Sequence, residues 1–167
     1  MRGVKGIWLG LFLLAGAVSA AREIQPAPAN LQETIMVARD RVYPALVNIS
    51  VVMESVSGGR QVRQRGTGSG TILDAEGHVL TNHHVAGLAT HVVCTLSSKE
   101  EIPAEVVGTD AMTDLTVLKL KLSERKDPSA PLPIATLGDS DALAVGDYVL
   151  AMGSPLGMAR SVTLGIV

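Results

Sequence analysis

Short runs in which apolar and polar residues alternate dominate the chain from residue 46 onward. Val47, Ile49 and Val51 alternate with Asn48 and Ser50. This two-residue period is typical of half-buried β-strands. Further strands are expected where apolar runs lie between Gly-, Ser- or Asp-containing turns, within 66–73, 79–85, 91–96, 102–110, 114–122, 146–155 and 160–167. Short strands at such close spacing predict an all-β sandwich or barrel.

One helix is expected before the strands. Apolar residues at Leu31, Ile35, Ala38 and Val42 follow a helical spacing. Asn30 is a suitable N-cap residue, and Pro44 should end the helix. The preceding segment 21–30, "AREIQPAPAN", is rich in Pro and Ala and predicts an unstructured linker.

The first 20 residues have the pattern of a secretory signal peptide. Two basic residues in "MRGVK" precede the apolar run "GIWLGLFLLAGAV" and the small residues "SAA". The run is shorter than the roughly 20 apolar residues of a transmembrane helix, so no stable membrane span is expected. An uncleaved N-terminal anchor is the alternative. Residues 1–20 thus predict export from the cytoplasm.

Composition narrows the classes of function. Loss of Arg2 and Lys5 with the signal peptide leaves 12 basic and 16 acidic residues, a balance that does not favour nucleic acid binding. Cys94 is the only cysteine, so a disulfide within the chain is excluded. Val92 and Leu96 lie at strand spacing from it, which predicts that Cys94 is a small buried hydrophobe.

The sequence "TNHHV", residues 81–85, places His83 and His84 next to each other. They could include a catalytic base, bind a metal, or be polar residues at the end of a strand. Adjacent residues of a strand point to opposite faces, which disfavours a shared metal. A catalytic base needs a carboxylate to orient it. Asp114, at the start of an alternating segment, is the first candidate and Asp110 the second.

The order of several motifs resembles the HtrA/Deg family of trypsin-like serine proteases. The chain contains "GTGSGTILDAEGHVLTNHHV", then "GTDAMTDLTVLKL", then "LGDSDALAVGDYVLAMGSPLGMARSVTLGIV". The resemblance covers residues 31–167. It implies a double β-barrel of the chymotrypsin type, of which this chain holds the first barrel and the opening strands of the second. It makes His84 the general base and Asp114 its orienting carboxylate, and it leaves His83 at a variable position.

The same resemblance implies an exported, periplasmic endopeptidase that is trimeric, needs no cofactor and cleaves unfolded or damaged polypeptides. The family's G-N-S-G-G nucleophile motif does not occur in residues 1–167. Ser69 and Ser154 stand in other motifs and are poor candidates for that role. The expectation is an incomplete protease domain, 31–167, that is inactive alone. A polypeptide-binding or inhibitory module and an unrelated exported barrel are the alternatives. The polar segment 54–66 is expected to be a solvated loop or hairpin tip.

Overall fold

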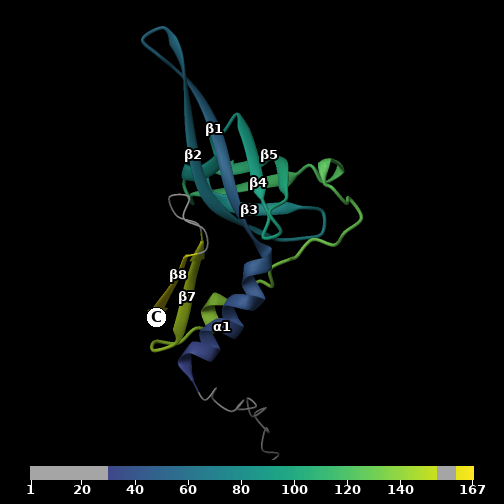
Figure 1. Ribbon diagram of the computed structural model, residues 1–167. Helices are drawn as coiled ribbons and strands as arrows, with labels where there is room; N and C mark the ends of the chain where they lie inside the picture. Colours follow the sequence, from purple (N-terminus) through teal and green to yellow (C-terminus); the bar gives the residue numbers. More distant parts are fainter. Residues whose placement is uncertain (1–29, 154–160) are drawn as a thin grey trace, which may run out of the picture.

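The computed structural model describes residues 30–153 and 161–167. Within them, six antiparallel strands close into a barrel in the order β1-β2-β3-β6-β5-β4, and β7 and β8 form a separate hairpin (Figure 1). The all-β prediction is confirmed. The barrel strands are β1 (Leu46–Ser57), β2 (Arg60–Ile72), β3 (His78–Asn82), β4 (His91–Thr95), β5 (Glu101–Asp110) and β6 (Leu115–Leu120); β7 is Tyr148–Gly153 and β8 is Ser161–Ile166.

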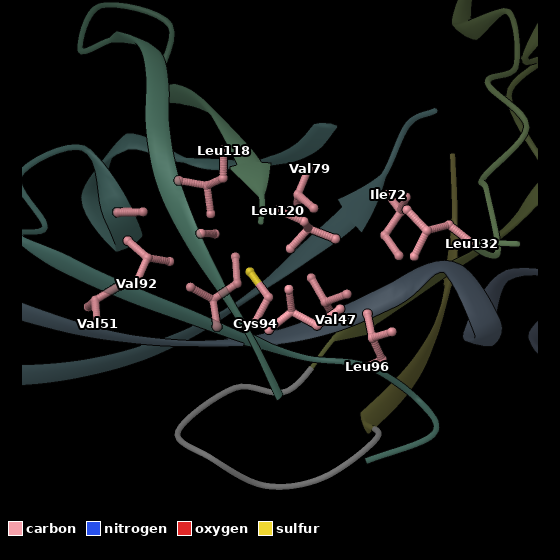
Figure 2. Packing of buried hydrophobic residues seen from close by; sticks show 14 residues of the cluster. Val47, Val51, Ile72, Val79, Val92, Cys94, Leu96, Leu118, Leu120 and Leu132 are labelled. Atoms are coloured by element: carbon pink, nitrogen blue, oxygen red, sulfur yellow. The ribbon is translucent and has the colours of Figure 1, made fainter. Parts of the chain in front are cut away.

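The barrel interior is filled by aliphatic side chains, because the sequence has few aromatic residues to offer. Within the closed part of the barrel, alternate strand residues point inward, and Ile72 and Leu118 are completely buried (Figure 2). Ile49 of β1 is also completely buried. Cys94 lies among them, as predicted, and burial raises the pKa of its thiol to about 12. A thiol in this environment stays protonated and packs as a hydrophobe.

The predicted N-terminal helix is present as α1, Leu31–Val42. The side chain of Asn30 accepts a hydrogen bond of 2.7 Å from the backbone N–H of Gln32, the expected N-cap. Pro44 lies in a following 3-10 turn, Tyr43–Ala45, where the α-helix has ended. The helix lies below the barrel beside β7, and none of its residues is fully buried (Figure 1).

The segment 54–66 differs from the expected loop. Strands β1 and β2 continue through it and pair residue by residue up to Ser57 and Arg60. Only Gly58 and Gly59 form the tip, both with positive φ, as a two-residue hairpin turn of type I′ requires. The expectation of a hairpin tip was therefore right for two residues and wrong for the others, which form an extended arm (Figure 1).

The predicted strand over 79–85 ends early. Strand β3 stops at Asn82, and residues His83–Ala86 form a short helix, α2. The backbone N–H of His83 donates to the carbonyl of Asp114 and that of Gly87 donates to the carbonyl of His83, which turns the chain out of the sheet. The prediction that both histidines lie on a strand was therefore wrong. Among the described residues, no group of three or more metal-binding side chains exists.

The remaining connections are short helical turns. Strand β6 ends at Leu120, and Leu122, expected on the same strand, lies in a 3-10 turn, Leu122–Glu124. A third 3-10 turn, Ser140–Ala142, precedes β7. No helix in the described part of the chain is long and apolar enough to cross a membrane. The expected signal peptide and nearly all of the linker lie outside the described residues.

Candidate active site

His84 and Asp114 lie in direct contact, although 30 residues separate them in the sequence. Nδ1 of His84 is 2.7 Å from Oδ2 of Asp114, and the backbone N–H of His84 donates to Oδ1 at 2.9 Å. The carboxylate therefore holds both the ring and the backbone of the same histidine. Pairing of β3 with β6 brings the two residues together, because Asn82 at the end of β3 lies opposite Leu115 at the start of β6.

The backbone of Asp114 has an unusual conformation that neighbouring groups stabilise. Its φ is 57°, in the left-handed region that Asp tolerates better than most residues. Its carbonyl accepts the N–H of His83 at 3.0 Å and Nδ2 of Asn82 at 3.1 Å. Nδ2 of Asn82 also lies 3.3 Å from Oδ2 of Asp114. Sequence reasoning overlooked Asn82, which orients the carboxylate from the next strand.

These hydrogen bonds favour the ionised form of Asp114. The backbone N–H of His84 is the main cause that lowers the pKa of Asp114, and the hydrogen bond from the His84 ring adds to it. An ionised carboxylate accepts the Nδ1 proton, which leaves the lone pair of neutral imidazole on Nε2. Nε2 of His84 has no hydrogen-bond partner among the described residues. The arrangement is suited to removing a proton from a nucleophile.

The competing residues have other roles. Asp110 accepts the N–H of Met112 at 2.9 Å and the hydroxyl of Thr113 at 2.8 Å, so it stabilises the turn that leads to Asp114. Nδ1 of His83 lies 2.6 Å from the hydroxyl oxygen of Thr109, a contact separate from the pair formed by His84 and Asp114. The structure therefore brings Asp114, and not Asp110, to His84.

A cleft of about 450 Å³ lies between the barrel and the β7–β8 hairpin. His84 and Asn82 line it from the barrel, Met152 and Ser161 from the hairpin. Ser69 of β2 also lines it, and its carbonyl accepts the hydroxyl of Thr81 at 2.8 Å. Ser154, the other serine considered from the sequence, lies outside the described residues.

Two of the residues that line this cleft, Gly68 and Val85, pack closely against each other. A Cβ atom at Gly68 would overlap the side chain of Val85, whose Cγ2 would be only 2.7 Å away. Val85 follows His84 directly in α2. The glycine thus allows α2 to pack closely on β2, and this packing sets the position of the His84 backbone.

The family model of the trypsin-like peptidase domain matches residues 68–167, more than half of the chain. The chain belongs to the HtrA/Deg-like trypsin-type serine proteases. It is 47% identical over 113 residues to a probable periplasmic serine endoprotease, DegP-like, of Pseudomonas putida. That match covers 68% of this chain and 22% of the relative. A putative serine protease, HhoA, of Synechocystis is 34% identical and is matched over 97% of this chain and 48% of its own length.

Solved structures give the same result for the fold. The HtrA-type protease AlgW with a tripeptide matches with a TM-score of 0.67 and 36% identity, over 80% of this chain and 39% of AlgW. AlgW with a decapeptide matches with a TM-score of 0.64 and 34% identity, over 80% of this chain and 45% of AlgW. The family prediction made from the motifs is confirmed. The chain spans less than half the length of each of these relatives.

Proposed function

We propose that His84 and Asp114 are the base and the orienting carboxylate of a serine endopeptidase. In this mechanism Nε2 of His84 accepts the proton of a serine hydroxyl as the oxygen attacks a peptide carbonyl, and then returns it to the leaving amine. Asp114 stabilises the imidazolium formed between these steps. The observation that carries the proposal is the double contact of Asp114 with the ring and the backbone N–H of His84.

The nucleophile belongs, in this proposal, to a longer protease of which residues 31–167 form part of the catalytic domain. No G-N-S-G-G sequence occurs in residues 1–167, and the DegP-like relative is matched over only 22% of its length. The side chains of His84 and Asp114 are 69% and 44% exposed, so more of the domain would be needed to exclude water from the pair. Acyl transfer needs the nucleophile, the base and the oxyanion donors together, so the 167-residue chain alone should not cleave peptides.

Two observations support a proposed periplasmic setting. The DegP-like relative is named as periplasmic, and residues 1–20 have the pattern of a signal peptide, with 21–30 as a linker. We infer a periplasmic protease, trimeric when complete, that acts on unfolded or damaged polypeptides. AlgW with bound peptides supports a polypeptide substrate.

The first test is the coding sequence beyond codon 167. A reading frame that continues into a G-N-S-G-G motif supports the proposal, and the full-length protein can then be assayed on an unfolded protein such as casein. His84→Ala should abolish cleavage. Loss of cleavage must not come from unfolding, so the thermal unfolding of the variant is compared with that of the wild type. Casein cleavage that survives His84→Ala would refute the assigned role.

A further inference from the structure

The β1–β2 arm, residues 53–66, extends beyond the rest of the barrel (Figure 1). Strand β1 pairs with β4 only as far as Val52, and β2 pairs with β3 only at Thr71 and Ile72. Among the described residues, no strand therefore pairs with residues 60–70 of β2 on the side away from β1. An unpaired strand edge can pair with another extended chain.

Three hydrogen-bonding features show which residues direct their backbone groups to this outer edge. The N–H of Leu73 donates to the carbonyl of His78 on β3, and the carbonyl of Ser69 accepts the hydroxyl of Thr81, also on β3. The two-residue turn at Gly58–Gly59 makes Arg60 a partner of β1. Since the direction alternates along a strand, the odd-numbered residues face outward. These are Gln61, Arg63, Arg65 and Thr67 in the arm and at its base.

The arm is positively charged in a chain that is negative overall. It carries Arg60, Arg63 and Arg65 against one acidic residue, Glu54, whereas the formal charge of the whole chain is −2. Arg63 pairs with Glu54 at 2.8 Å. Arg60 and Arg65 form no ion pair among the described residues.

The positive charge of the arm distinguishes between two possible partners of this edge, the arm of a second copy and an acidic polypeptide segment. If the same arm of a second copy paired with it, arginines would face arginines across the new ladder, which is unfavourable. Side chains alternate between the two faces of a strand, so Arg60 and Arg65 lie on opposite faces of β2. An extended segment with Asp or Glu at successive positions would place carboxylates near both arginines. The edge also leads to Thr67, which lines the cleft that contains His84.

We propose that the outer edge of β2, residues 61–67, binds acidic extended polypeptide segments by strand addition. Backbone hydrogen bonds supply the affinity for any extended chain, and the arginines select acidic ones. The proposal rests on the proposed function and deepens it by naming a class of polypeptide that the protease would hold beside its cleft. Binding itself requires no catalysis, so it can be tested on the 167-residue chain.

The test measures fluorescence anisotropy of labelled peptides of about eight residues, a usual strand length, titrated with the purified chain. One peptide repeats Thr-Glu-Glu, which places Glu on both faces of an extended strand, and the other repeats Thr-Gln-Gln. We expect the Glu peptide to bind about ten-fold more tightly at low salt, and this preference to disappear in the double variant Arg60→Glu/Arg65→Glu. The variant Lys121→Glu/Lys126→Glu makes the same change of net charge at exposed lysines away from the arm and should retain the preference.

A second pair of peptides separates strand addition from attraction between charges. Two versions of the Glu peptide are made, one N-methylated at the odd-numbered residues and the other at the even-numbered residues. Each version keeps the charge of the peptide and loses half of its backbone N–H donors. Methylation of the residues whose backbone N–H groups point to the β2 edge should abolish binding. Equal affinities for Glu and Gln peptides, an unchanged preference in Arg60→Glu/Arg65→Glu, or tight binding of both methylated peptides would each overturn the proposal. Because no cleavage is measured, none of these outcomes depends on the roles of His84 and Asp114.

Discussion

Two histidine–aspartate pairs with nearly the same hydrogen bonds lie at different places on this barrel. In one, His84 contacts Asp114 through its backbone N–H at 2.9 Å and through Nδ1 at 2.7 Å. In the other, His78 contacts Asp74 through its backbone N–H at 3.0 Å and through Nδ1 at 2.6 Å. In each pair the N–H donated to the carboxylate is the first cause that lowers the pKa of the aspartate.

The pairs differ in what lies next to the other ring nitrogen. Nε2 of His78 lies 3.3 Å from Nζ of Lys119, so its lone pair accepts from an ammonium group. His84 instead lines the cleft. The pair formed by Asp74 and His78 also closes a local turn of four residues, whereas the pair formed by Asp114 and His84 joins two strands. A histidine bound to an aspartate is therefore not by itself evidence of a base; the access of a nucleophile to Nε2 distinguishes the two.

The largest expected effect comes from removing each histidine in the full-length protease. His84→Ala should lower kcat for casein cleavage by about 10⁵- to 10⁶-fold, because the serine loses its base. The matched variant His78→Ala should retain kcat within about two-fold, since His78 is not among the residues that line the cleft. Similar losses of activity in both variants, with both still folded, would show that the comparison is wrong.

The aspartates should differ by a smaller factor. Asp114→Asn keeps the shape of the side chain but can no longer fix the tautomer, and kcat should fall by about 10⁴-fold. Asp74→Asn should leave kcat nearly unchanged and lower the melting temperature by a few degrees, since it weakens a turn. Steady-state kinetics and thermal unfolding of both variants measure the two effects; a normal kcat in Asp114→Asn would contradict the orienting role.

Two glycines extend the comparison to the backbone around each pair. Gly68→Ala forces Val85 away and should shift the adjacent His84, at a cost of about 1–3 kcal/mol in stability and about 10²-fold in kcat. Gly77, which precedes His78, has a φ of 86°, so Gly77→Ala should cost about 1–2 kcal/mol in stability alone. Urea unfolding measures the loss of stability of each glycine variant, and steady-state kinetics measure its kcat. Equal kcat values in the two variants would contradict the expected difference.

The smallest effect, on the pH dependence of stability, should be shared by the two pairs. Both aspartates have a lowered pKa in the folded state, so each adds stability above the unfolded pKa of about 3.9 and loses it as pH falls through the folded pKa. Asp74→Asn and Asp114→Asn should each flatten the fall of the unfolding free energy below about pH 4. Glu105→Gln is the control, because it removes an exposed carboxylate that forms no such hydrogen bond within residues 30–153 and 161–167. If the unfolding free energy of either aspartate variant fell with pH as steeply as that of the wild type, the hydrogen bonds described for that aspartate would not be the cause of the pH dependence.

Much of the barrel could be predicted because its strands alternate between an aliphatic interior and a polar exterior, as Val47, Ile49 and Val51 do. The strands of the β1–β2 arm could not be predicted in this way. Both faces of the arm are exposed and carry polar residues, so the sequence shows no alternation of apolar and polar positions there. The short helix α2 has only four residues, which is too few for a helical period to be recognised in the sequence.

For the site, the motifs selected His84 and Asp114, and the structure brings them together. The positive φ of Asp114 and the contacts of Asn82 could not be read from the sequence, because they depend on how β3 lies against β6. The pair His78 and Asp74 was also overlooked, although the spacing of four residues in a turn was a signal that could have revealed it.

The most direct test of the central claim, that His84 and Asp114 act as one catalytic unit, is a double-mutant cycle in the full-length protease. The values of kcat/KM for casein-derived peptides are measured for the wild type, Asp114→Asn, His84→Ala and the double variant. If Asp114 acts only through His84, adding Asp114→Asn to His84→Ala should cause no further loss. A further loss near the full factor of about 10⁴ expected of Asp114→Asn alone would show that the two residues act independently and would contradict the account.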